Sequence, residues 1–154
     1  MSFPEIDPDQ IDWSLFSAQE RVVVEEYLRR KQLQAKGKNF LDFAQYVYPD
    51  FVVEEIHVLI ARHFEMLKNR EIDRLLISLP PRAGKSLMSS QLLPSWWMGQ
   101  FPKDQILHTS YASGLVDKFG RYIRNTIMSS PYQDIFPETQ VAKDSRAANQ
   151  WATT

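Results

Sequence analysis

The sequence contains no cysteine. Disulfide bonds and thiolate metal sites are therefore excluded, and a reducing compartment suits such a chain. Hydrophobic residues make up 44% and charged residues 24% of the 154 residues, which are ordinary values for a folded protein rather than a disordered one. A chain of this length buries about two-thirds of the surface that it exposes when unfolded, so we expect one core.

The sequence also lacks an excess of either charge and any long apolar run. Its net charge of -1 is unlike the basic surplus of proteins that hold nucleic acid tightly, so contact with DNA should be local or transient. No run approaches the roughly 20 apolar residues needed to span a bilayer. The N-terminus, MSFPEIDPDQ, is acidic where a signal peptide would be basic. These features predict a cytosolic protein without membrane contact.

Capping signals and apolar spacing predict five helices. Ser17 and Glu20 have the spacing of a capping box, and Asn39 can cap a second helix that Pro49 stops. Helical periodicity supports the other three, one of which should be bent or shortened at Pro94. The expected helices cover residues 18–36, 40–48, 54–69, 86–100 and 113–130.

Two compact apolar runs, at residues 74–79 and 105–110, have the length of buried strands rather than helices. With the helices, they give the order of three helices, strand, loop, helix, strand and helix. This alternation predicts an α/β fold in which helices flank a parallel sheet with right-handed crossovers.

A candidate phosphate-binding loop lies between the first expected strand and the helix that follows it. The segment LPPRAGKS ends in the Gly84-Lys85-Ser86 of the P-loop motif G-x-x-x-x-G-K-[ST], although Leu79 stands where the first glycine belongs. A strand before the loop and a helix after it are the context that this motif requires. We therefore interpret the segment as the phosphate-binding loop of a P-loop NTPase fold rather than an ordinary turn.

The residue types of this loop fit the chemistry of a bound triphosphate. Backbone N–H groups from Arg82 to Leu87 can donate to phosphate oxygens at the positive end of a helix dipole. Gly84 allows a tight turn because it has no Cβ, Lys85 supplies an ammonium for the β- and γ-phosphates, and Ser86 can ligate Mg²⁺.

Two interpretations of Arg82 remain open at the level of sequence. It is either a solvated loop residue or a cation that reaches the γ-phosphate and stabilises the charge that develops there. The spacing of the motif does not distinguish these two roles.

The run from Leu75 to Thr139 resembles the N-terminal ATPase domain of large terminase subunits, the DNA-packaging motors of tailed bacteriophages. The resemblance rests on PPRAGKS, on the pattern W-x-x-G-x-x-P formed by Trp96, Gly99 and Pro102, and on TSYASGLVDKFGRYIRN after the second expected strand. The closing NQWATT is similar to a later segment of the same family, so the resemblance covers residues 40–154. It divides the chain into an N-terminal arm with an amphipathic helix, residues 1–38, and the N-terminal part of a P-loop ATPase domain, residues 39–154.

The resemblance implies an ATPase that uses ATP and Mg²⁺ to drive double-stranded DNA through a portal protein into a procapsid. Such motors act as homo-oligomeric rings, usually with a small terminase subunit, at the procapsid portal in the host cytoplasm. By resemblance, Lys85 and Arg82 are the catalytic residues, Ser86 is the metal ligand, and His57 lies near the adenine. The nucleotide-binding residues that it implies are Pro81, Arg82, Ala83, Gly84, Lys85, Ser86, Leu87 and His57.

The sequence also departs from this family. After Ser86 there is no Walker B segment, a run of four apolar residues that ends in Asp and is followed by an acid, and there is no nuclease domain. Hydrolysis requires such acids. We therefore expect the chain to be the N-terminal part of a longer protein and to be inactive in hydrolysis alone. The alternatives are another P-loop translocase or helicase, and a short nucleotide-binding module without activity.

Overall fold

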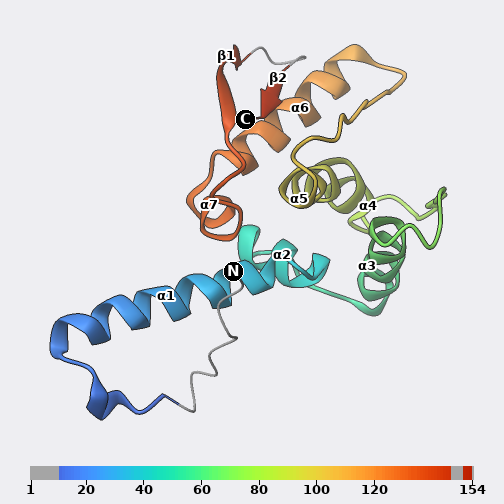
Figure 1. Cartoon of the computed structure of the whole chain (residues 1–154). Coiled ribbons are helices and arrows are strands. Elements are labelled where there is room, and N and C mark those ends of the chain that lie inside the picture. Colours follow the sequence, from blue (N-terminus) through green and yellow to red (C-terminus); the bar gives the residue numbers. More distant parts are fainter. Residues whose placement is uncertain (1–10, 147–150, 154) are drawn as a thin grey trace.

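The computed structural model describes residues 11–146 and 151–153 of the chain (Figure 1). Helices account for most of the described residues, which also form one small sheet. The helical elements in order are η2 (Trp13–Leu15), α1 (Ala18–Lys36), α2 (Phe40–Val47), α3 (Glu55–Lys68), α4 (Lys85–Leu87), η3 (Met88–Leu92), α5 (Leu93–Gln100), α6 (Ser113–Ile127) and α7 (Ser130–Ile135). The strands are β1 (Val141–Arg146) and β2 (Trp151–Thr153).

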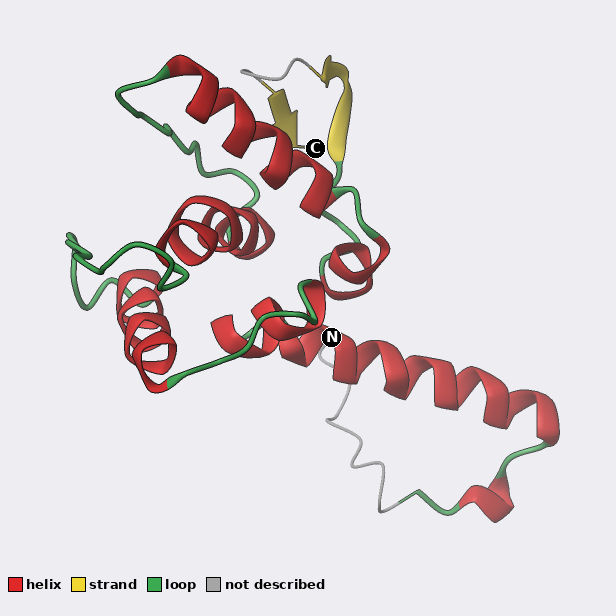
Figure 2. Cartoon of the chain, turned by 180° about the vertical axis from the view of Figure 1, so that it is seen from behind, coloured by secondary structure: helices red, strands yellow, loops and turns green. Residues whose placement is uncertain are grey.

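The prediction of a P-loop α/β fold with a parallel sheet is wrong for this structure. The sheet in the described part of the chain is a single antiparallel pair, β1 with β2, which lies beside α6 (Figure 2). Residues 74–79 and 105–110, expected as buried strands, pair with no other described segment. A mostly helical chain with one antiparallel pair does not fit a parallel-sheet P-loop NTPase.

The two segments expected as strands show why their apolar pattern led to a wrong prediction of a sheet. Along residues 75–79, half-buried side chains alternate with exposed ones, and Leu76 is 95% exposed. Residues 105–108 alternate in the same way, with Leu107 89% exposed. Alternation of this kind is typical of an extended chain with one face against a core. The apolar runs therefore indicated segments that pack on the helices, but a sheet also requires a neighbouring strand.

Local capping predicted the first helices correctly. The Ser17 side chain accepts from the Glu20 N–H, and the Glu20 carboxylate accepts from the Ser17 N–H at 2.8 Å. The Asn39 Oδ1 atom accepts from the amides of Leu41 and Asp42 at 2.8 and 3.1 Å. These side chains satisfy N–H groups that have no acceptor within their helices. In Figure 1, α1 extends away from the other helices.

Residues 85–100 form one continuous helical stretch, although its middle turn is π-helical. Pro94 lacks an N–H group and cannot donate to the carbonyl of Ser90. The Leu93 N–H instead reaches back five residues to the carbonyl of Met88 in the π-helical turn η3. The helix therefore passes through Pro94 and ends at Gln100.

The core is aromatic and lies where α2, α3 and α5 meet. The Phe40 ring packs edge-on against Phe64 and Trp96, with ring centroids 4.9 and 5.4 Å apart. The Trp96 Nε1–H donates to the carbonyl of Gly37 at 2.6 Å. Because this indole is fully buried, the hydrogen bond satisfies a donor that would otherwise be costly to bury.

One residue of the W-x-x-G-x-x-P pattern, Gly99, has a packing role here. A Cβ on Gly99 would collide with the ring of Phe136, so the glycine permits α5 and the segment after α7 to approach closely. Next to this contact, the buried Tyr132 hydroxyl donates to the carbonyl of Ser95 at 3.0 Å. Burial raises the pKa of the Tyr132 hydroxyl, which stays protonated and keeps this hydrogen bond.

The C-terminal part contains elements that the sequence did not predict. Helix α6 begins after Ala112 and buries Phe119, Ile123 and Ile127 on one side, as its periodicity indicated. Helix α7, with Ser129 as its N-cap, and the strands β1 and β2 follow it. No helix within the described ranges has the length and apolar character needed to cross a membrane.

Candidate functional site

The predicted phosphate-binding loop leads into the N-terminus of α4. Arg82 and Gly84 both adopt left-handed backbone conformations, with φ angles of 69° and 70°. The helix then begins with a hydrogen bond from the Met88 N–H to the carbonyl of Gly84 at 3.0 Å. The amides of Lys85, Ser86 and Leu87 precede this bond and have no acceptor within the helix. These N–H groups are therefore available to an anion.

The side chains beside these amides add positive charge and one hydroxyl group. Lys85 is half-buried, and Ser86 is exposed. Lys85 forms no ion pair with another residue in the described ranges. The Ser89 Oγ–H donates to the carbonyl of Lys85 at 2.8 Å and ties the first turn together. Leu87 packs against the core, which leaves only its amide for binding.

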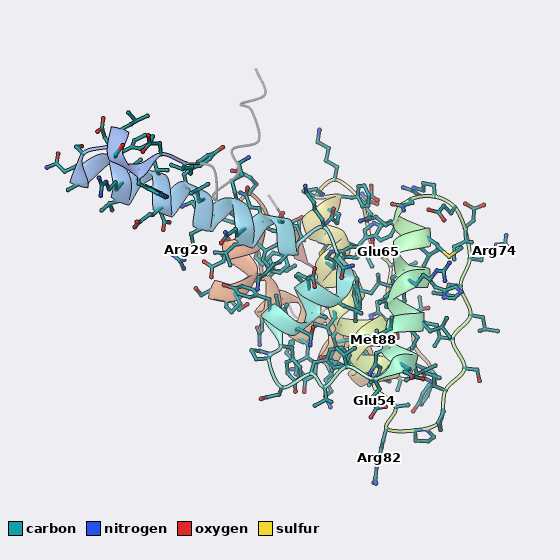
Figure 3. The ribbon with its side chains drawn as sticks, turned by 90° about the horizontal axis from the view of Figure 1, so that it is seen from below. Arg29, Glu54, Glu65, Arg74, Arg82 and Met88 are labelled. Atoms are coloured by element: carbon teal, nitrogen blue, oxygen red, sulfur yellow. The ribbon has the colours of Figure 1, made fainter. Side chains whose placement is uncertain are left out.

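Arg82 does not join the other predicted site residues. It is exposed, and its side chain points away from the body of the protein in Figure 3. Pro81 beside it is also exposed and donates no hydrogen bond, because proline has no N–H group. The structure thus brings Ala83, Gly84, Lys85, Ser86 and Leu87 together at the start of the helix and leaves Arg82 facing solvent.

His57 contacts the loop directly. It lies in the first turn of α3, and only 6% of its surface is exposed. Its Nε2 atom is 3.4 Å from the carbonyl oxygen of Ala83, and a Cβ on Gly84 would be only 2.9 Å from the same nitrogen. His57, which the resemblance placed near an adenine, thus contacts the loop backbone in this structure.

The residues that hold His57 were not recognised from the sequence. The Glu54 N–H donates to Nδ1 of His57 at 3.0 Å, and the Phe51 ring packs against the imidazole with centroids 5.0 Å apart. Glu54 and His57 have the three-residue spacing of a capping box but not its residue types, so the motif did not indicate them. Figure 3 shows Glu54 at the end of α3 next to the loop that carries Arg82.

The fit of Mg²⁺ to this site depends on the nucleotide. No group of three or more His, Asp or Glu side chains that could hold a metal occurs within residues 11–146 and 151–153. Ser86 supplies a single hydroxyl oxygen. Mg²⁺ is commonly bound through one or two carboxylates with phosphates and water, and P-loop proteins add a Ser or Thr hydroxyl, so Ser86 fits as one ligand of a nucleotide-bound ion.

A pocket of about 580 Å³ lies apart from the loop, between α5 and the segment that follows it. It does not include residues 81–87. On its rim, the Trp97 Nε1–H donates to the Asp104 carboxylate at 3.0 Å. The pocket is lined by Ser89, Leu93, Pro94, Trp97, Asp104, Gln105, Ile106, Leu107, His108 and Thr109. Residues 81–87 therefore do not line this cavity.

Comparisons with protein-family models, with curated proteins and with solved structures found no match to this chain.

Proposed function

We propose that this chain is the ATP-binding part of a motor that moves double-stranded DNA into a viral procapsid. The observation that carries the proposal is the loop at residues 81–87, where Gly84 turns with φ of 70° and three amides without helical acceptors follow it. The order of the motifs that resemble large terminase subunits supports the assignment to packaging.

The loop would bind the phosphates through groups that belong to the loop and the helix alone. The N–H groups of Lys85, Ser86 and Leu87 lie at the positive end of the helical stretch that runs from residue 85 to Gln100. The Lys85 ammonium has no carboxylate partner among the described residues and is free to pair with a phosphate. This mode of binding does not depend on a parallel sheet.

Ser86 would hold Mg²⁺ together with oxygens of the nucleotide. The bound ion would neutralise charge on the β- and γ-phosphates. The exposed Ser86 side chain lies beside the loop amides, where its hydroxyl oxygen would ligate the ion. Arg82 is exposed and its side chain points away from the body of the protein, so its roles in binding and catalysis stay predictions.

The proposal also includes the partners that a packaging motor requires. A packaging motor would act as a ring with a portal protein and a small terminase subunit in the host cytoplasm. The small net charge of -1 favours transient rather than static contact with double-stranded DNA, as translocation requires.

A comparison of three adenine nucleotides tests the proposal. If the loop binds the β- and γ-phosphates, ATP and ADP should bind the chain in the presence of Mg²⁺, while AMP should bind at least about tenfold more weakly, because it lacks those phosphates and their charge-assisted hydrogen bonds. Isothermal titration calorimetry with each nucleotide measures this order. Equal affinity for ATP and AMP would show that the base or the sugar, rather than the loop, determines binding.

A further inference from the structure

His57 uses both nitrogens of its ring within the protein. Its Nδ1 atom accepts a hydrogen bond from the Glu54 N–H at 3.0 Å, so in the neutral ring the proton is on Nε2. The Nε2–H group faces the carbonyl of Ala83 at 3.4 Å. With the ring 6% exposed and packed on Phe51, no ring nitrogen remains for a nucleobase.

The contact with Ala83 sets the direction of the next amide. In a trans peptide the C=O and N–H groups point in opposite directions. When His57 holds the carbonyl of Ala83 toward α3, the N–H of Gly84 must point away from α3. The orientation of the first peptide before the helix is therefore coupled to one imidazole.

The same imidazole restricts what residue can occupy position 84. Gly84 has φ of 70°, a conformation that side chains disfavour, and a Cβ there would lie 2.9 Å from Nε2 of His57. The absence of a side chain at Gly84 thus allows the loop backbone to lie against the His57 ring.

We propose that His57 is a positioning residue that orients the backbone of the Ala83–Gly84 peptide for phosphate binding, and that it does not contact the adenine. This inference rests on the proposed function, since it assigns a role within the same loop. A substitution of His57 should then change the affinity for the phosphates, through the loop backbone, rather than the affinity for the adenine base.

Two substitutions of His57 by amide side chains distinguish the roles of its two ring nitrogens. In His57→Asn, the short amide can place an acceptor where Nδ1 lies, but nothing replaces Nε2. In His57→Gln, the longer amide can place an N–H donor where Nε2 lies. The first variant should therefore keep the hydrogen bond at the start of α3 and lose the loop contact, and the second should keep the loop contact.

The probes are ATP and inorganic tripolyphosphate, each titrated into the whole chain with Mg²⁺. We expect His57→Asn to weaken both probes by the same factor, about three- to tenfold, which is the worth of one net hydrogen bond. His57→Gln should recover most of the affinity for both. The control is His63→Asn on the same helix, where the ring has its Nδ1 atom 2.8 Å from the carbonyl oxygen of Leu59, and affinity should not change.

Thermal unfolding of each variant checks that the fold is retained. A loss confined to ATP, with tripolyphosphate unaffected, would place His57 at the adenine and overturn the inference. Equal losses in the Asn and Gln variants, or no loss in either, would overturn it as well. If the unsubstituted chain bound neither probe, the proposed function itself would fail, and the role of His57 would fall with it.

Discussion

Substitution of Trp96 by alanine is expected to lower the free energy of unfolding by about 3–5 kcal/mol, the usual cost of removing a fully buried aromatic side chain. The indole has no exposed surface, and it packs edge-on against Phe40. The Lys68 ammonium lies 4.9 Å from its ring centroid. The substitution also leaves the carbonyl of Gly37 without the indole N–H. Chemical denaturation followed by circular dichroism measures the loss.

The neighbouring Trp97 provides a matched control. It is half-buried, and its indole N–H donates to the exposed Asp104 rather than to a buried carbonyl. We expect Trp97→Ala to cost less than half as much as Trp96→Ala, since water can replace part of what is lost. Equal destabilisation by the two substitutions would mean that the core is not centred on α2, α3 and α5 as the structure places it.

Replacing Lys85 by alanine should weaken the binding of ATP by about 10- to 100-fold, because a charge-assisted contact with the phosphates is removed. Lys85 is half-buried beside three amides that have no helical acceptor, and it has no ion-pair partner in the described part of the chain. Calorimetric titration with ATP and Mg²⁺ gives the affinity of each protein. Thermal stability should change little, since no described ion pair is broken.

Lys103→Ala controls for the loss of one positive charge. Lys103 is exposed in the turn after α5, away from the loop, and its removal should leave the affinity for ATP unchanged. If both lysine variants weakened binding equally, ATP would be responding to the overall charge of the protein. If Lys85→Ala bound ATP as tightly as the unsubstituted chain, this loop would not be the phosphate site.

The helices could be predicted because their signals are local. The capping box of Ser17 with Glu20 and the cap at Asn39 each involve residues within three positions, and both are present in the structure. Apolar periodicity likewise placed α3 and α6. Such signals act through hydrogen bonds and packing within one or two turns, so they do not depend on how the rest of the chain folds.

The sheet could not be predicted in this way because pairing is nonlocal. The runs at 74–79 and 105–110 have the composition of strands, yet the described structure gives them no neighbour, whereas the pair formed by β1 and β2 has a polar sequence, VAKDSR, in one strand. Strand composition reflects burial and packing more than an intrinsic preference of the backbone. An apolar run therefore indicates that a segment will be packed, but it does not indicate which elements the segment packs against.

The site was predicted in part. The motif indicated the positions of Gly84, Lys85 and Ser86 at the start of a helix, where the structure has them. It did not indicate that Arg82 would face solvent or that His57 would contact the loop backbone. The His57 contact depends on how α3 lies against the loop, because it joins residues 26 positions apart in the sequence.

The most direct test of the account is the response of individual backbone amides to a bound nucleotide. In two-dimensional nitrogen–proton NMR spectra of the labelled chain, a titration with ADP and Mg²⁺ should produce its largest shifts at the amides of Gly84, Lys85, Ser86 and Leu87. The amides of residues 104–109, which line the separate pocket, should remain unchanged. Shifts concentrated at residues 104–109, with the loop amides unmoved, would contradict the claim that this loop binds phosphates.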